Sequence, residues 1–248
     1  MTYYGSNPKG RASFHDTLSH EARAAFAQLG TRRRYAVGEV LMHEGDQAQE
    51  LVILHEGMVK VTARLGSERM SLVDIRIAGD VVGEVAAMDL GPRSATVTAC
   101  GHVAATVVPR HELESFLFTN PETWIALNRM ICGRLRRSDR WRLEFSRYPV
   151  AVRLARVLVE LATSYGQPDR KNSVRIDVNL SQSEFAALIG SKTNTVHKAL
   201  AGLREEGIIR TGHRQTYVRD LPRLRRAARL GTSVVELTGR WTVRDASS

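Results

Sequence analysis

The segment from Val82 to Val97 combines side chains that can bind a phosphate group and a sugar hydroxyl. Glu84 follows a glycine in a short turn, and Arg93 lies nine residues further along the chain. A planar guanidinium binds phosphate oxygens through two parallel hydrogen bonds, and an ionised carboxylate is a strong acceptor for a hydroxyl. The segment therefore predicts a pocket for a phosphate beside a free sugar hydroxyl. Gly83 precedes Glu84, and Ser94 and Ala95 follow Arg93.

A second group of polar residues lies in a pattern of two short helices. Ser181 and Glu184 form a capping box, in which each side chain accepts a hydrogen bond from an amide at the helix start. Gly190 ends this helix, and Ser191 is expected to cap a second helix that ends near Gly207. Two short helices joined by a glycine-containing turn are typical of a helix-turn-helix.

The exposed positions of these two helices carry side chains suited to DNA. Asparagine can pair with adenine through two hydrogen bonds, and lysine can reach guanine acceptors or phosphate. The amide groups at the start of the first helix suit a backbone phosphate. Residues 208–218 then predict a β-hairpin wing. An ordinary solvated helix surface is the alternative for each polar residue. The candidate DNA contacts are Ser181, Ser183, Lys192, Thr193, Asn194, His197 and Lys198.

The positive charge of the chain is concentrated in its C-terminal part. The formal net charge is +10, and residues 148–248 hold 17 Lys and Arg against 9 Asp and Glu. Residues 1–147 are nearly neutral, with 19 basic and 17 acidic residues. A basic domain joined to a near-neutral one is the electrostatic pattern of nucleic-acid binding by one part. A merely basic surface is the alternative, and charge alone leaves the two about equal.

Composition and spacing argue against other classes. The apolar runs are only a few residues long and the N-terminus has no apolar core, so we expect a cytoplasmic protein without a membrane segment. The 8 histidines lack metal-ligand spacing, and neither a G-x-S-x-G motif nor a P-loop occurs, so we expect neither an enzyme nor a metal site. Cys100 and Cys132 are expected to be buried free thiols, with an intersubunit disulfide as the less favoured alternative.

The elements that must position these groups change along the chain. Residues 1–17 are expected to be a loose tail, followed by a short helix from Leu18 to Leu29 with Ser19 as its N-cap. From about Thr31, short β-type runs alternate with glycines, which predicts a sandwich or barrel. The predicted strands are 39–42, 51–54, 58–61, 70–73 and 95–99.

A long helix is predicted between the β region and the helix-turn-helix. A short helix from Pro109 to Phe118 is broken at Asn120, and Pro121 suits the first position of a helix that continues to Tyr148. Its seam recurs every three or four positions at Trp124, Leu127, Ile131, Leu135, Ser138, Trp141 and Phe145. A narrow seam favours pairing with a second copy of the helix, and packing on its own β domain is the alternative. The neighbouring arginines are interpreted as a solvated face: Arg134, Arg136, Arg137, Arg140 and Arg142.

Taken in order, these features resemble the Crp/Fnr family of regulators, in particular its cyclic-AMP-receptor branch. The turns at 37–41, 44–46 and 56–61 are similar to those of a cyclic-nucleotide-binding β-roll, and 82–97 is similar to its phosphate-binding cassette. The resemblance implies an α+β fold with a jelly-roll-like β-roll, a dimerisation helix and a winged helix-turn-helix. The implied segments are a tail (1–17), a β-roll domain (18–119), a dimerisation helix (120–148), a DNA-binding domain (149–220) and a C-terminal extension (221–248).

The family's properties supply expectations for function. The chain would be a homodimeric, sequence-specific DNA-binding regulator that acts on a pseudo-palindromic operator and with RNA polymerase. A cyclic nucleotide would gate its DNA affinity, with cAMP as first choice and cGMP as second. Gly83 and Glu84 would contact the ribose and Arg93 the cyclic phosphate, to which Ser94 would add a hydroxyl and Ala95 a backbone N–H. Ser138 and Asp139 on the long helix would contact the base.

The chain departs from this branch in the DNA-reading helix. Thr193, Asn194 and Lys198 stand where the branch has arginine, glutamate and a second arginine, so a different operator is expected. Three alternatives stay open: a β-roll that has lost its ligand, with Glu84 paired to Arg93; another effector such as a cyclic dinucleotide; and a basic domain that holds an acidic protein. Beyond the resemblance, 221–230 predicts a basic helix and 234–243 a terminal hairpin.

Overall fold

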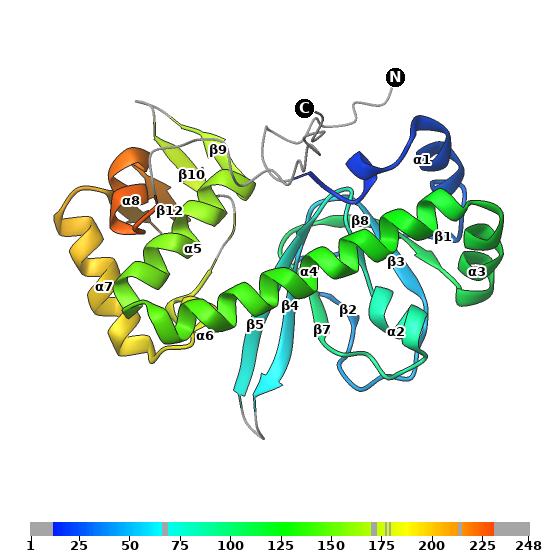
Figure 1. Ribbon diagram of the computed structural model, residues 1–248, viewed down its shortest axis with the longest axis horizontal. Helices are drawn as coiled ribbons and strands as arrows, with labels where there is room; N and C mark the ends of the chain where they lie inside the picture. Colours follow the sequence, from blue (N-terminus) through cyan, green and yellow to red (C-terminus); the bar gives the residue numbers. More distant parts are fainter. Residues whose placement is uncertain are drawn as a thin grey trace, which may run out of the picture.

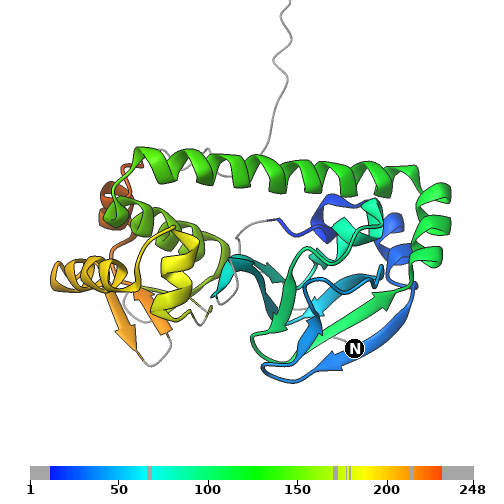
Figure 2. The ribbon, with the colours of Figure 1, turned by 90° about the horizontal axis from the view of Figure 1, so that it is seen from below.

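The computed structural model describes residues 12–65, 69–169, 173–176, 178, 180–212 and 215–230. An N-terminal β domain and a C-terminal α+β domain are joined by the long helix α4 (Pro121–Arg147), as Figure 1 shows. Both domains lie on the same side of α4 (Figure 2). Within the described ranges, no helix combines the length and the hydropathy needed to cross a bilayer.

The β domain consists of two four-stranded antiparallel sheets with an apolar core between them. One sheet has the order β1 (Thr31–Tyr35), β8 (Val103–Val108), β3 (Leu51–Glu56) and β6 (Val81–Val82). The other has the order β2 (Val40–Met42), β7 (Thr96–Ala99), β4 (Met58–Leu65) and β5 (Arg69–Ile77). Val52 and Leu54 of β3 meet Val59 of β4 and Val97 of β7 in this core. The predicted sandwich or barrel class is therefore confirmed.

Three strands of this domain were not expected from the sequence. The five predicted runs all lie within or overlap observed strands, but β1, β6 and β8 were missed. Strand β8 pairs with both β1 and β3, although its two alanines weaken the β-type pattern. Strand β1 is an edge strand with the exposed run Arg32–Arg34, which hides the alternation of a half-buried strand.

The N-terminal helix confirms its predicted cap, but the expected loose tail is wrong for its last residues. Helix α1 (His20–Phe26) begins after Ser19, whose hydroxyl oxygen accepts a 3.1 Å hydrogen bond from the Ala22 amide. The short 3-10 turn η1 (His15–Thr17) packs on the β domain. Phe14 is buried against Phe26, and the His15 amide donates to the Gly79 carbonyl at 2.8 Å.

Helix α4 begins at Pro121, directly after α3 (Arg110–Thr119), as predicted. Most of the predicted seam faces the chain's own domains. Leu127 is buried and Ile131 is packed in the core of the β domain, which matches the alternative of packing on the chain's own β domain. Leu135, Ser138 and Trp141 line the cavity between α4 and the domains, although Leu135, like Trp124, keeps a large exposed fraction. The Phe145 side chain lies outside the described part of the chain.

The C-terminal domain has the predicted helix-turn-helix and wing. Helix α5 (Val150–Tyr165) leads to β9 (Gly166–Pro168), β10 (Val174–Ile176), α6 (Gln182–Leu188), α7 (Thr193–Glu205), β11 (Ile209–Gly212), β12 (Gln215–Val218) and α8 (Leu221–Ala227). The four strands form one antiparallel sheet in the order β11-β12-β10-β9. Helix α8 confirms a helix after the wing, whereas the predicted hairpin at 234–243 lies outside the described residues.

Both cysteines were expected to be buried, and this expectation is wrong. Cys132 on α4 is exposed, and Cys100 is only partly buried.

Candidate functional site

The cassette is built around Gly83, which has a left-handed backbone conformation (φ +79°) before the short helix α2 (Glu84–Asp89). A Cβ atom at this position would lie 2.4 Å from Nη1 of Arg93 and 2.8 Å from the Glu50 carbonyl oxygen. Only glycine combines this conformation with that close approach. The turn therefore places the α2 backbone and the Arg93 guanidinium side by side.

Arg93 is fixed from two directions. Its Nη1 donates to the Gly83 carbonyl at 3.1 Å, and its Nη2 donates to Oε2 of Glu50 at 3.0 Å. The side chain is almost completely buried, and burial lowers the pKa of its guanidinium, an effect that Glu50 partly offsets. The expected alternative of an ion pair between Glu84 and Arg93 is not observed, since each has a different partner.

Glu84 pairs with Arg134 from helix α4. Nη1 of Arg134 contacts Oε1 of Glu84, and its Nη2 donates to the Val81 carbonyl at 3.0 Å. Burial and the nearby Arg76 both lower the pKa of Arg134. The interpretation of Arg134 as part of a solvated face is therefore wrong. The sequence analysis missed Arg134 as a site residue, because helical spacing placed it beside the seam but did not show that α4 crosses the cassette.

The predicted phosphate residues meet in one pocket. Gly83, Glu84, Arg93, Ser94 and Ala95 line it together with Arg76 and Arg134. The pocket adjoins a cavity of about 600 Å³ between the β domain, α4, α5 and α6. This volume is in the range of small-molecule sites.

The two residues predicted to contact the base are placed differently. Ser138 lines the larger cavity, beside Trp141. Asp139 does not line the larger cavity of its own chain. Its carboxylate accepts a 2.6 Å hydrogen bond from the exposed side chain of Arg142. The cavity is also lined by Arg137 and by Asp74 of β5, whose carboxylate contacts Arg76.

The start of the helix-turn-helix confirms the predicted capping box. The Glu184 amide donates to Oγ of Ser181 at 3.2 Å, and the Ser181 amide donates to Oε2 of Glu184 at 2.7 Å. The Ser181 amide is therefore engaged within the helix and is not free for a phosphate. The hydroxyls of Ser181 and Ser183 lie 2.9 Å apart on an exposed surface.

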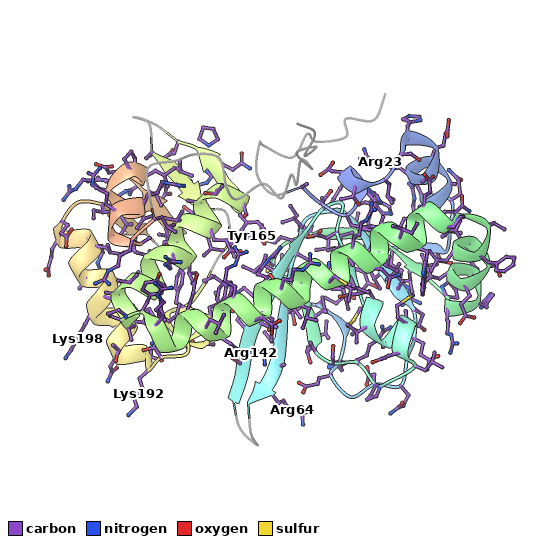
Figure 3. All side chains as sticks on the ribbon, viewed as in Figure 1. Arg23, Arg64, Arg142, Tyr165, Lys192 and Lys198 are labelled. Atoms are coloured by element: carbon purple, nitrogen blue, oxygen red, sulfur yellow. The ribbon has the colours of Figure 1, made fainter. Side chains whose placement is uncertain are left out.

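Helix α7 presents its polar residues to solvent. Val196, Leu200 and Leu203 are buried, which fixes the opposite face outward. On that face Lys192, Asn194, His197 and Lys198 are exposed and Thr193 is partly exposed. Figure 3 shows Lys192 and Lys198 projecting away from both domains. The expected N-cap at Ser191 is wrong by one residue, because the helix is preceded by Lys192 without a side-chain cap.

Comparison with known proteins finds a matching family model for each of the two domains. Residues 32–120 match the cyclic nucleotide-binding domain model, and residues 152–227 match the Crp-like helix-turn-helix domain model. The chain is 32% identical over 219 residues to a CRP-like cAMP-activated global transcriptional regulator of Mycobacterium tuberculosis, covering 88% of this chain and 97% of that protein. The chain belongs to the Crp/Fnr family of transcriptional regulators. It is accordingly a DNA-binding regulator with a cyclic-nucleotide-binding domain.

Other Crp/Fnr relatives agree with this assignment. The Cyclic AMP receptor protein of Thermus thermophilus is 26% identical and matches 86% of this chain and 94% of its own length. A crystal structure of a CRP-family regulator from Thermus thermophilus has a TM-score of 0.67 at 27% identity, covering 79% of this chain and 96% of that one. The c-di-GMP responsive regulator CLP of Xanthomonas campestris has a TM-score of 0.70 at 18% identity, which is a likeness of fold. It covers 81% of this chain and 99% of that one.

Proposed function

We propose that this Crp/Fnr regulator is a homodimer whose affinity for a pseudo-palindromic operator is controlled by a cyclic nucleotide bound between the cassette and α4. The first candidate is cAMP and the second is cGMP. RNA polymerase contact and a cytoplasmic location belong to the same proposal. The observation that carries it is the convergence of Glu84, Arg93 and Arg134 in one pocket that α4 closes.

The electrostatics of the pocket support a phosphate ligand. Buried polar groups normally have hydrogen-bond partners. Within the described part of the chain, the Nε atoms of Arg76, Arg93 and Arg134 are buried and have none. An anion with several acceptor oxygens would satisfy donors of this kind. In this proposal the cyclic phosphate binds Arg93 with Ser94 and Ala95, and the ribose hydroxyl competes with Arg134 for Glu84.

The position of the cavity supports a base directed toward α4. A base that extends from the phosphate pocket enters the space lined by Ser138. Asp139 would then act from the uncovered side of α4 toward the partner subunit's pocket in a dimer. The Mycobacterium tuberculosis relative is described as cAMP-activated, which favours adenine over guanine as the first candidate.

Calorimetric titration tests the ligand half of the proposal. We expect cAMP or cGMP to bind the unmodified protein, and Arg93→Gln to weaken binding by about 2–5 kcal/mol, because a buried charged contact is lost. Arg64→Gln is the matched control, since Arg64 is an exposed arginine of β4 outside the pocket. Absence of heat with either nucleotide, or equal effects of the two substitutions, would refute this half.

Binding-site selection tests the DNA half. Asn194→Ala should relax base preference at one position in each half-site, at a cost of roughly 1–3 kcal/mol. Thr195→Ala is the control, because Thr195 is an exposed neighbour on α7 to which no base contact is assigned. An unchanged sequence preference for Asn194→Ala would remove the proposed role of this residue.

A different effector is the second candidate. The cavity beside the pocket, at about 600 Å³, leaves room for a ligand larger than one nucleotide. Titration with a cyclic dinucleotide, alongside cAMP and cGMP, separates the two candidates. Only the true effector, either a mononucleotide or a dinucleotide, should bind with an affinity that Arg93→Gln lowers.

A further inference from the structure

The β domain makes a direct contact with the helix-turn-helix. Helix α6 packs against β5, and Figure 1 shows the two elements side by side. Leu72 and Ile75 of β5 are buried in the same apolar cluster as Phe185 and Leu188 of α6. The hydroxyl of Tyr165, at the end of α5, donates to the Ile75 carbonyl at 3.1 Å in a buried position between the domains (Figure 3).

An ion pair joins the two domains at this contact. Nζ of Lys60 on β4 is 2.6 Å from Oε1 of Glu184 on α6. The two side chains are only 20% and 25% exposed, so solvent screens the pair less than a surface salt bridge. The other carboxylate oxygen of Glu184 accepts hydrogen bonds from Ser181. Burial alone would raise the pKa of Glu184, but Lys60 and Ser181 together hold that pKa below its ordinary value.

The same strands line the ligand cavity. Val61 of β4, next to Lys60, contributes to both the phosphate pocket and the larger cavity. Leu72 and Ile75 of β5 also line the cavity, and Ala187 and Leu188 of α6 line its opposite side. A shift of β4 and β5 on ligand binding would therefore act directly on the element that holds Glu184. Packed elements of this kind transmit a shift because interiors are close-packed.

We propose that Lys60 is a positioning residue for DNA reading, which holds the helix-turn-helix against the ligand domain through Glu184 and so couples effector binding to DNA affinity. The proposal rests on the proposed gating by an effector. Glu184 also belongs to the capping box of α6. The ion pair with Lys60 therefore fixes the start of the first helix of the helix-turn-helix. Coupling requires two arrangements with different stability, and this ion pair contributes only to the arrangement in which the domains touch.

Hydrogen exchange of the full-length protein, without effector or DNA, tests the contact itself. Lys60→Met keeps the length of the side chain and removes its charge. We expect faster exchange of the amides in α6 and β4 than in the unmodified protein. Lys60→Arg should restore protection, and Arg64→Met, which removes a charge from the exposed end of the same strand, should leave it unchanged. Unchanged exchange in Lys60→Met would overturn the proposal.

DNA affinity with and without saturating effector tests the coupling. For Lys60→Met we expect the ratio of the two dissociation constants to change at least threefold, whereas Arg64→Met keeps the ratio. A purely structural defect would shift both constants by the same factor, and that result would overturn the proposal. Tyr165→Phe is the second variant if Lys60→Met does not fold, because it removes another interdomain hydrogen bond without a change of charge.

The two proposals fail in different ways. If neither cyclic nucleotide binds the unmodified protein, the gating proposal fails, and the exchange comparison still decides whether Lys60 holds the domains together. If an effector binds and changes DNA affinity, but the ratio in Lys60→Met is unchanged, the gating proposal stands and the role of Lys60 is refuted.

Discussion

At the scale of single residues, Gly83 sets the geometry of the cassette in two separable ways. Its positive φ of 79° disfavours any side chain, and the absence of a Cβ lets the Arg93 guanidinium reach the turn. Gly38 has nearly the same φ, 81°, but no heavy atom lies within 4 Å of the place that a Cβ would occupy there. Substitution of Gly38 therefore tests backbone strain alone, whereas substitution of Gly83 adds a steric clash that displaces Arg93.

This comparison gives a prediction for Gly83→Ala. Gly38→Ala should lower the free energy of unfolding by about 1–2 kcal/mol, because alanine is strained at positive φ. Gly83→Ala should lower it by more, because its Cβ would also clash with the Glu50 carbonyl. Only Gly83→Ala should also weaken nucleotide binding, since it displaces Arg93. Chemical denaturation and calorimetric titration of both variants check this. Equal ligand affinity in the two variants would show that the close approach to Arg93 has no role in binding.

The site could be predicted from sequence only where its residues are neighbours in the chain. The cassette from Gly83 to Ala95 is local, so its motif was visible and the structure places those residues in one pocket. Arg134 reaches the same pocket from a distant segment, and Glu50 reaches Arg93 from another. A helical pattern shows which residues share a face, but not which strand that face will cross. The role predicted for Asp139 stays a prediction, because it depends on a second chain.

At the scale of elements, the 3-10 turn η1 carries a histidine, His15, that makes the stability of the β domain depend on pH. His15 is partly buried, and its Nε2 is buried without a hydrogen-bond partner among the described residues. Burial, with a further contribution from Arg23, lowers its pKa from 6.5 to about 4. Burial likewise lowers the pKa of His55, whose ring centroid is 6.3 Å away. Between pH 6.5 and about 4, the unfolded chain therefore binds a proton at His15 that the folded chain does not.

The β domain should consequently lose stability as the pH falls from 6.5 toward 4. The loss from His15 is about 1–2 kcal/mol after allowance for its partial exposure. His15→Gln should reduce this pH dependence, while His20→Gln, a substitution of an exposed histidine on α1, should not. Urea denaturation at pH 7.5 and pH 5 measures the difference. The same pH dependence in His15→Gln and unmodified protein would contradict it.

Elements with local signals were the most predictable. Helices α1 and α6 carry their own caps at Ser19 and Ser181, so their starts could be read directly. Strands β1 and β8 lack such signals, because their stability comes from pairing with each other across the sequence. The tail was expected to be loose because it is polar, but the single aromatic Phe14 is enough to anchor its end in the apolar core.

At the scale of the whole molecule, α4 has an uncovered side. Both domains lie on the opposite side of this helix (Figure 2). Trp124, Ile125 and Leu143 are large apolar residues of α4 that remain exposed and do not line the cavity between the domains. Exposed apolar groups on one long helix are typical of a protein interface. These residues support self-pairing of α4 in a dimer, which would place two α7 helices to read successive major grooves.

Substitution of Ile125 tests this arrangement. Ile125 is 47% exposed on α4, and a glutamate there would place like charges together in a paired helix. We expect Ile125→Glu to be monomeric in sedimentation, and to bind a palindromic operator about 100-fold or more weakly, because two linked half-site contacts become independent. Val37→Glu is the control, since Val37 is 63% exposed and lies outside α4. A dimeric Ile125→Glu with unchanged operator affinity would place the interface elsewhere, and the action of Asp139 across the dimer would fail with it.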